Sequence, residues 1–243
     1  DSGSFAMVKR HEFIAILDEV AGALRQMAEA GIAGVDCSPE SLKALDTWGR
    51  SRGEPPAARV ETLEDIRAHI GDCRRCKLCR SRTNIVFGAG SPQARLMFIG
   101  EGPGQEEDRA GEPFVGAAGQ LLNRIIDAIK LRRSDVYIAN VVKCRPPGNR
   151  LPEPEEIATC SPFLRRQINA IRPLFICTLG SCAVQTLLST SEPVSRLRGR
   201  FFDYQGIRVL PTFHPAYLLR NPEKKREVWE DMKRLMKEFP YED

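Results

Sequence analysis

The stretch RLMFIGEGPGQEED, residues 95–108, decides the fold. Its first part, RLMFIG at 95–100, is an apolar run typical of a strand buried on both faces. Gly100, Gly102 and Gly104 then open a turn whose backbone N–H groups can approach a ligand closely. The turn has neither the GxGxxG pattern of dinucleotide-binding proteins nor the Gly-Lys-Ser/Thr of a P-loop. It therefore predicts a functional turn that is not a phosphate cradle, with a plain strand-to-helix connection as the alternative.

Apolar runs and helical patterns alternate along the rest of the chain. We expect further strands at residues 135–141, 174–179 and 207–213, and helices at 62–70, 117–131, 153–171, 181–188 and 222–239. This alternation predicts a three-layer α/β/α fold with a central parallel sheet and helices on both faces. Such sheets place their sites at the carboxyl ends of the strands, so the turns there are the candidates for chemistry.

The first 60 residues have a different character. Helical periodicity covers residues 11–30, a second short helix is expected at 39–49, and SRGEPPAARV at 51–60 has the composition of a linker. We interpret residues 1–57 as an N-terminal helical extension, with a remnant of cloning before Met7, and residues 58–243 as the main domain.

Composition and charge exclude several classes of protein. The chain has 243 residues, of which 42% are hydrophobic and 28% charged, as in ordinary globular domains. No run approaches the roughly 18 apolar residues that a membrane span needs, so no membrane partner is expected. Residues 61–243 carry 29 Lys and Arg against 23 Asp and Glu. A mildly basic body favours an anionic partner such as nucleic acid.

Three side chains follow expected strands or turns and have chemical potential. Phe114, in GEPFVG, is suited to stack on a ring at a pocket wall, although a core position is the commoner use of Phe. Asn140 ends an apolar run, and its planar amide can read a base edge, with local backbone bonding as the alternative. His214 ends the last strand before a proline, which makes it a catalytic candidate rather than a purely structural histidine.

The cysteines indicate a metal or cluster site. The start of the chain, DSGSFAMVKR, lacks the apolar segment of a secretory signal, so we expect a cytosolic protein with reduced thiols. Cys73, Cys76 and Cys79 follow at three-residue spacing, and Cys144 and Cys160 lie in polar, proline-rich surroundings. Four thiolates hold zinc or an iron–sulfur cluster equally well, and the residues alone leave both open.

Four motifs in series resemble the iron–sulfur, or family 4, uracil-DNA glycosylases over residues 62–243. They are GEGPGQEED at 100–108, EPFVGAAGQLL at 112–122, IANVVKCRPPGNR at 138–150 and TFHPAYLLRNP at 212–222. The pattern of the sister family 5 is less similar, because its first turn ends in Pro-Ala. The resemblance implies a four-stranded central parallel sheet and a [4Fe-4S] cluster. The cluster ligands that it implies are Cys73, Cys76, Cys144 and Cys160.

The resemblance also implies a reaction, the hydrolysis of the N-glycosidic bond of deoxyuridine in DNA during base excision repair. Phe114 would stack on the extruded uracil, and Asn140 would pair with its N3–H and O4. Glu107 would exclude the methyl group of thymine, and His214 would donate to O2 as negative charge develops there. Gly102 and Glu101 would shape the water site. The best-known uracil glycosylases have Asp in place of Gly102, which leaves no strong general base and predicts a largely dissociative reaction.

We expect the DNA contacts in two segments. Leu218, Leu219 and Arg220 follow His214, and apolar side chains there can wedge into the gap left by an extruded base. Arg198, in the basic run SRLRGR at 195–200, is expected to contact phosphates, with a solvated basic turn as the alternative. The expected protein is a monomer acting on uracil-containing DNA in the prokaryotic cytosol, close to the nucleoid.

Two other functions fit the same motifs. A related branch of the superfamily traps uracil-DNA covalently through a histidine in a basic insertion, but the stretch at residues 109–113 is short and has no histidine. A cluster-bearing scaffold that binds a polymerase would neither release uracil nor trap DNA.

Overall fold

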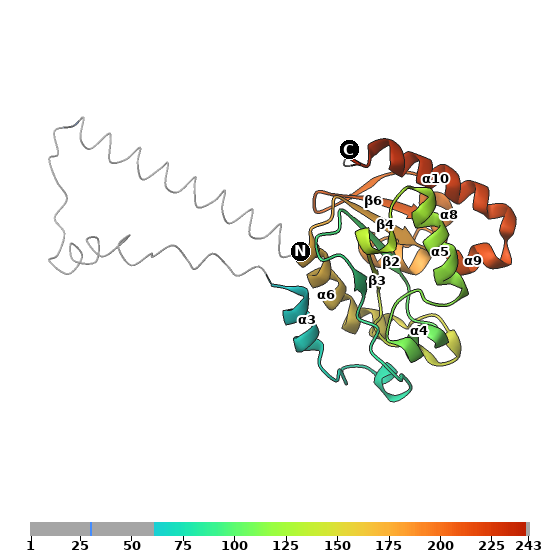
Figure 1. The fold of residues 1–243 in the computed structure, drawn as a ribbon. Helices are drawn as coiled ribbons and strands as arrows, with labels where there is room; N and C mark the ends of the chain where they lie inside the picture. Colours follow the sequence, from blue (N-terminus) through green and yellow to red (C-terminus); the bar gives the residue numbers. More distant parts are fainter. Residues whose placement is uncertain (1–29, 31–60, 242–243) are drawn as a thin grey trace. The chain divides into compact units, whose positions relative to one another are not determined.

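The computed structural model describes residue 30 and residues 61–241, which contain a six-stranded sheet (Figure 1). The strand order is β1-β3-β2-β4-β6-β5. β2 (Leu96–Gly100), β3 (Tyr137–Asn140), β4 (Phe175–Leu179) and β6 (Ile207–Thr212) pair in parallel. β1 (Ala89–Gly90) and β5 (Phe202–Tyr204) pair antiparallel at the two edges. The expected number of four strands is therefore too low, because the expectation missed both short edge strands.

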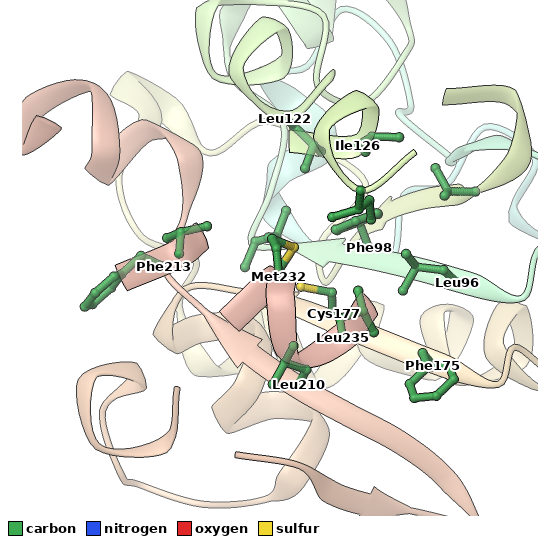
Figure 2. Close-up of a cluster of buried hydrophobic side chains, with 14 of the residues drawn as sticks. Leu96, Phe98, Leu122, Ile126, Phe175, Cys177, Leu210, Phe213, Met232 and Leu235 are labelled. Carbon is green, nitrogen blue, oxygen red and sulfur yellow. The ribbon is translucent and has the colours of Figure 1, made fainter. Parts of the chain in front are cut away.

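One face of the sheet is covered by α5 (Ala117–Ala128) and α10 (Lys225–Glu238). Figure 2 shows this core, in which Leu122 and Ile126 of α5 and Met232 of α10 surround Phe98 of β2. Each of these four side chains is at most 1% exposed. Each buried side chain of this size contributes roughly 1.5–3 kcal/mol relative to an exposed one, so this layer fixes the position of β2.

The other face is covered by α6 (Pro154–Ile171) and α7 (Ser181–Leu188). Met97 and Ile99 of β2 point to this side and pack with Leu164 and Ile168 of α6. Successive residues of β2 are therefore buried on opposite faces, as a continuous apolar run in a parallel sheet predicts. Helices on both faces confirm the three-layer α/β/α architecture.

Most helices lie close to their expected positions. α3 (Leu63–Ile70) begins with a capping box, in which Thr62 Oγ1 accepts from the Asp65 N–H and the Asp65 carboxylate accepts from the Thr62 N–H. The structure adds three short helices that periodicity did not predict, α4 (Gln105–Ala110), α8 (Val194–Leu197) and α9 (Pro215–Arg220). Short 3-10 helices complete the described part: Lys77–Arg80, Arg133–Asp135, Pro147–Asn149 and Pro222–Lys224. The predicted extension over 1–57 lies outside the described residues.

The register of the sheet positions the functional turns. Gly100, the last residue of β2, pairs with Asn140, the last residue of β3. Thr212 ends β6 beside Leu179 of β4, and His214 follows two residues later. The turns after β2, β3 and β6 therefore leave the same edge of the sheet. No helix in the described ranges is long and apolar enough to cross a membrane.

Candidate active site

The turn after β2 lies directly against the chain that leaves β3. The N–H of Val141 donates to the Gly100 carbonyl at 2.9 Å, and the N–H of Val142 donates to the Glu101 carbonyl at 3.1 Å. A Cβ on Gly102 would come within 2.7 Å of Cγ2 of Val142. Glycine is therefore needed at residue 102 for close packing, which explains why a bulkier residue does not occupy this place.

Glu107 holds the first turn and the Phe114 loop together. Its carboxylate accepts hydrogen bonds from the backbone N–H groups of Gly104 at 3.1 Å, Val115 at 3.0 Å and Gly116 at 2.9 Å. The side chain also lines the cavity described below. The position is compatible with the predicted contact to a pyrimidine ring, and the three bonds give Glu107 a structural role that the sequence did not reveal.

Phe114 and His214 approach each other from distant parts of the chain. Their ring centroids are 5.5 Å apart and their planes are inclined by 31°. Phe114 is 5% exposed and has φ of +53°, a left-handed conformation that non-glycine residues rarely adopt. Strain of this kind persists where the surroundings enforce it, and here Gly119 packs so closely that an added Cβ would meet the Phe114 carbonyl oxygen at 1.9 Å.

His214 is held as a neutral imidazole. It is the N-cap of α9, and its Nδ1 accepts a hydrogen bond from the N–H of Ala216 at 3.1 Å. Because Nδ1 is an acceptor, the proton of the neutral ring is on Nε2. Burial lowers the pKa of His214 to about 4, Arg220 adds to this lowering, and Glu107 opposes it. The ring can therefore donate a hydrogen bond from Nε2 at neutral pH without carrying a positive charge.

Asn140 presents a buried oxygen that lacks a protein partner. The residue is 1% exposed, and its Oδ1 has no hydrogen-bond partner within the described part of the chain. A buried acceptor without a partner costs free energy of about 1–3 kcal/mol. Such a group is explained when a ligand supplies the missing donor.

These side chains line one cavity of about 390 Å³. The predicted residues at its wall are Glu101, Gly102, Glu107, Phe114, Asn140, His214 and Arg220. The volume lies in the range of small-molecule sites. Burial raises the pKa of Glu101 above its usual range. The structure thus brings together every predicted catalytic and base-binding residue.

Two of the predicted DNA contacts are corrected. Leu218 is 1% exposed and belongs to the core beneath α9, so it is not available as a wedge. Arg198 is 19% exposed at its side chain and pairs with the buried Asp231, with Nη2 to Oδ1 at 2.7 Å and Nε to Oδ2 at 3.1 Å. Arg198 therefore stabilises the protein interior. Leu219, at 42% exposed, and Arg220 remain on the surface.

The four predicted cysteine ligands surround a second, smaller cavity. Cys73, Cys76, Cys144 and Cys160 all line it, together with apolar side chains such as Phe163, whereas Cys79 does not. Cys177 lies fully buried within β4. Among the residues that the structure describes, no group of three or more His, Cys, Asp or Glu side chains forms a site for a single metal ion.

Positive groups and N–H donors approach the cysteine sulfurs. Arg82 donates to Sγ of Cys144 at 3.5 Å, Arg75 donates to Sγ of Cys73 at 3.3 Å, and the N–H of Lys143 donates to Sγ of Cys160 at 3.3 Å. Burial raises the pKa of Cys144 to about 12, although Arg82 opposes the shift. The surroundings thus contain donors for thiolates in an otherwise apolar pocket.

Sequence reasoning missed three features of the site. Lys143 is 2% exposed, and its Nζ donates to the Asn140 carbonyl at 2.8 Å and to Oε1 of Gln167 at 2.6 Å. Tyr217 and residues 149–151 also line the cavity. The polar run CRPPGNR at 144–150, separated from β3 by three residues, was the signal that could have indicated that this segment lines the cavity.

The comparisons with known proteins agree with this geometry. The family model "Uracil DNA glycosylase superfamily" matches residues 87–233, the range that contains the cavity-lining residues. The chain belongs to the uracil-DNA glycosylase superfamily. It is 46% identical over 180 residues to a type-4 uracil-DNA glycosylase of Thermotoga maritima, covering 72% of this chain and 94% of that protein.

Other members of the superfamily place the chain near the type-4 proteins. A type-4 uracil-DNA glycosylase of Archaeoglobus fulgidus is 43% identical over 184 residues, or 72% of this chain and 92% of that protein. A type-5 uracil-DNA glycosylase of Pyrobaculum aerophilum is 32% identical over 178 residues, or 66% of this chain and 78% of that protein. The higher identity to type-4 members confirms the resemblance inferred from the four motifs.

Proposed function

We propose that the protein is a uracil-DNA glycosylase that hydrolyses the N-glycosidic bond of deoxyuridine in DNA and acts in base excision repair. The observation that carries this proposal is the buried, unpartnered Oδ1 of Asn140 in a cavity that also holds Phe114 and His214. A uracil ring supplies what each group lacks: a donor at N3, a flat face and an oxygen at O2.

Recognition requires that the base first leaves the helical stack, because its glycosidic bond is unreachable inside a duplex. Phe114 then stacks on the extruded ring, a contact worth about 1–3 kcal/mol. Asn140 accepts from N3–H through Oδ1 and donates to O4 through its amide nitrogen. Cytosine presents the reverse pattern and would leave buried polar groups unpaired. Glu107, held in place by its three backbone donors, excludes the C5 methyl group of thymine by steric clash.

Bond cleavage leaves negative charge on uracil O2. The neutral His214 donates from Nε2 to this oxygen, and a preorganised donor of this type contributes about 10²–10³ in rate. A neutral donor does not form a stable ion pair with the departing base, so it favours the charge-separated transition state without retaining the product. Glu101 and the backbone at Gly102 position water on the sugar side. Because the sugar develops positive charge as the bond breaks, the attacking water needs little deprotonation.

The cysteine pocket fits the proposed [4Fe-4S] cluster. Cys73, Cys76, Cys144 and Cys160 would hold it, and a cluster spreads its four thiolates over several iron atoms, farther apart than around one ion. Arg82, Arg75 and the N–H of Lys143 supply the hydrogen bonds that thiolate sulfurs accept. When bound, the group would contribute structural cross-linking between residues 73–76 and the chain that leaves β3. The release of uracil depends on the cavity residues and water, and no step of it involves this group.

One assay tests the proposed function. The protein is incubated with a single-stranded oligonucleotide that contains one deoxyuridine, and with the same strand carrying thymine. Free uracil is measured by mass spectrometry, and the DNA is run on a denaturing gel. We expect uracil release from the first strand only. A shifted protein–DNA band without free uracil would support the covalent trap instead. If neither free uracil nor a shifted band appears, the protein is neither a glycosylase nor a trap.

The remaining expectations follow from this substrate. A protein that repairs chromosomal DNA acts where that DNA lies, so we propose the prokaryotic cytosol and its nucleoid as the location. Size-exclusion chromatography with light scattering tests the prediction of a monomer.

A further inference from the structure

Leu151 is an exposed apolar side chain at the active-site cavity. It is 71% exposed, more than any other large hydrophobic residue in the described ranges. The other exposed large hydrophobic residues there are Leu174, Leu219, Trp229 and Tyr241, and none of them lines this cavity. A single exposed leucine needs no explanation by itself, but Leu151 also has a specific place beside the cavity and lies on a loop held by specific bonds.

Leu151 lies where the cavity meets a neighbouring groove. The groove has a volume of about 930 Å³ and shares Glu101, Leu151, His214, Tyr217 and Arg220 with the cavity. A base bound against His214 has its sugar and neighbouring nucleotides outside the cavity. Since the groove opens directly beside the same histidine, a DNA strand that delivers a base to the cavity must pass close to Leu151.

The loop that carries Leu151 is fixed rather than free. Arg150 donates to the Leu151 carbonyl at 2.9 Å and forms two bonds to the carboxylate of Glu156, at 2.9 and 2.7 Å. Glu156 is 0% exposed and also accepts from the N–H of Glu153 at 2.8 Å. An ion pair with a buried carboxylate therefore holds the backbone at residue 151, and a loop fixed in advance loses little entropy on binding.

We infer that Leu151 packs against the bases beside the extruded nucleotide and helps to keep the target base out of the stack. An apolar side chain placed in this gap compensates for lost stacking. The inference rests on the proposed function. Arg220 lies at the same opening, and its charge suits the phosphates that position a strand. Leu218 is buried and Leu219 does not line the cavity, so Leu151 is the exposed large apolar side chain at this opening in the described part of the chain.

The variants Leu151→Ala and Leu174→Ala test this inference. Both remove an exposed leucine, but Leu174 is 46% exposed and lines neither the cavity nor the groove. Uracil release is measured in single turnover on a duplex and on a single strand, and the melting temperature reports folding. We expect Leu151→Ala to slow release from duplex about tenfold and from single strand less than about twofold, because only the duplex restacks. Leu174→Ala should match the unchanged protein.

A direct readout accompanies the rates. In duplex DNA with 2-aminopurine next to the deoxyuridine, fluorescence rises when the neighbouring base is unstacked, and we expect a smaller rise with Leu151→Ala. Equal losses on duplex and single strand would overturn the inference, because Leu151 would then act as a wall of the uracil pocket. Unchanged duplex rates would overturn it as well. If the unchanged protein releases no uracil, the proposed function itself fails, and the inference with it.

Discussion

The side-chain oxygen of Asn140 lies so close to Gly100 that a Cβ on Gly100 would come within 2.5 Å of it. The same Cβ would meet Cζ of Phe114 at 2.6 Å. Two paired strand ends therefore leave no room for a side chain at residue 100. The absence of that side chain allows the amide and the aromatic ring to line the same cavity.

Gly100→Ala should displace both groups from the cavity. We expect uracil release to fall at least about 100-fold, with a loss of stability of about 1–3 kcal/mol from overpacking. The rate and the urea midpoint are measured together. Gly206→Ala is the control, since an added Cβ there meets nothing within 4 Å, only its φ of +83° is unfavourable, and Gly206 does not line the cavity. Normal release by Gly100→Ala would contradict the geometry proposed for Asn140 and Phe114.

Asn140→Asp should weaken recognition of uracil. The ionised carboxylate only accepts hydrogen bonds, so the bond to uracil O4 becomes a repulsion. A loss of about 1–3 kcal/mol, or roughly 5- to 150-fold in release, is expected. Uracil and cytosine release from otherwise identical strands are compared, and the preference for uracil should narrow. An unchanged preference would mean that Asn140 does not read the base edge.

The pH dependence should reflect a neutral histidine. The pKa of His214 is lowered from 6.5 to about 4, so the folded protein resists protonation that the unfolded chain accepts. Stability should therefore decrease as pH falls from 6.5 towards 4 and should not decrease further from this group below 4.

Release rates should accordingly be flat between about pH 6 and about pH 8 and decline only in acid. His214→Ala should lower the rate about 10²–10³-fold at every pH while binding to uracil-DNA survives. Because Glu101 also has a raised pKa, the variant Glu101→Gln measures how much of the pH dependence of the release rate comes from Glu101 rather than from His214. An inflection near pH 6.5 that disappears with His214→Ala would show that the pKa of His214 is not lowered in the folded protein, and would contradict this prediction.

Cys144→Ser should remove the proposed cluster. We expect the unchanged protein to be brown with about four iron atoms per chain, and the variant to be colourless with a lower melting temperature. Cys79→Ser is the matched control, because Cys79 lies outside the cysteine cavity and its loss should leave colour and iron intact. A colourless unchanged protein that contains one zinc ion per chain would contradict the cluster.

Arg198→Met should destabilise the protein rather than weaken DNA binding. It leaves the Asp231 carboxylate buried with Thr212 Oγ1 as a remaining donor at 2.6 Å, and breaking a buried ion pair typically costs about 3–5 kcal/mol. Arg196→Met is the control, since Arg196 is 74% exposed and its pair with Glu192 is a surface contact. A large loss of DNA affinity with unchanged stability would restore the predicted phosphate contact.

The sequence predicted the fold where burial imposes a pattern. β2 is buried on both faces and therefore has an unbroken apolar sequence. The edge strands β1 and β5 are two and three residues long and only partly buried, which is too short for any periodicity to be visible.

The residues of the site likewise divide into those that a local sequence pattern predicts and those that it does not. The turns at strand ends were predictable because their residues are close in sequence to apolar runs. The burial of Leu218 was not, since two adjacent leucines look alike until α9 turns one inward and the next outward. Arg198 pairs with a residue 33 positions away, and no local pattern reveals such a partner. Lys143 was missed for the same reason, because its acceptor on Gln167 lies on another element.

The central place of β2 has a consequence for product release. All five of its residues are buried, and it is hydrogen-bonded to β3 on one side and β4 on the other. Amides in such a position exchange with solvent only when the whole domain opens. β2, which leads into the cavity-lining turn at Glu101 and Gly102, is therefore expected to stay closed during turnover. A freed base then departs through the mouth of the cavity, once the DNA that covers it has moved aside.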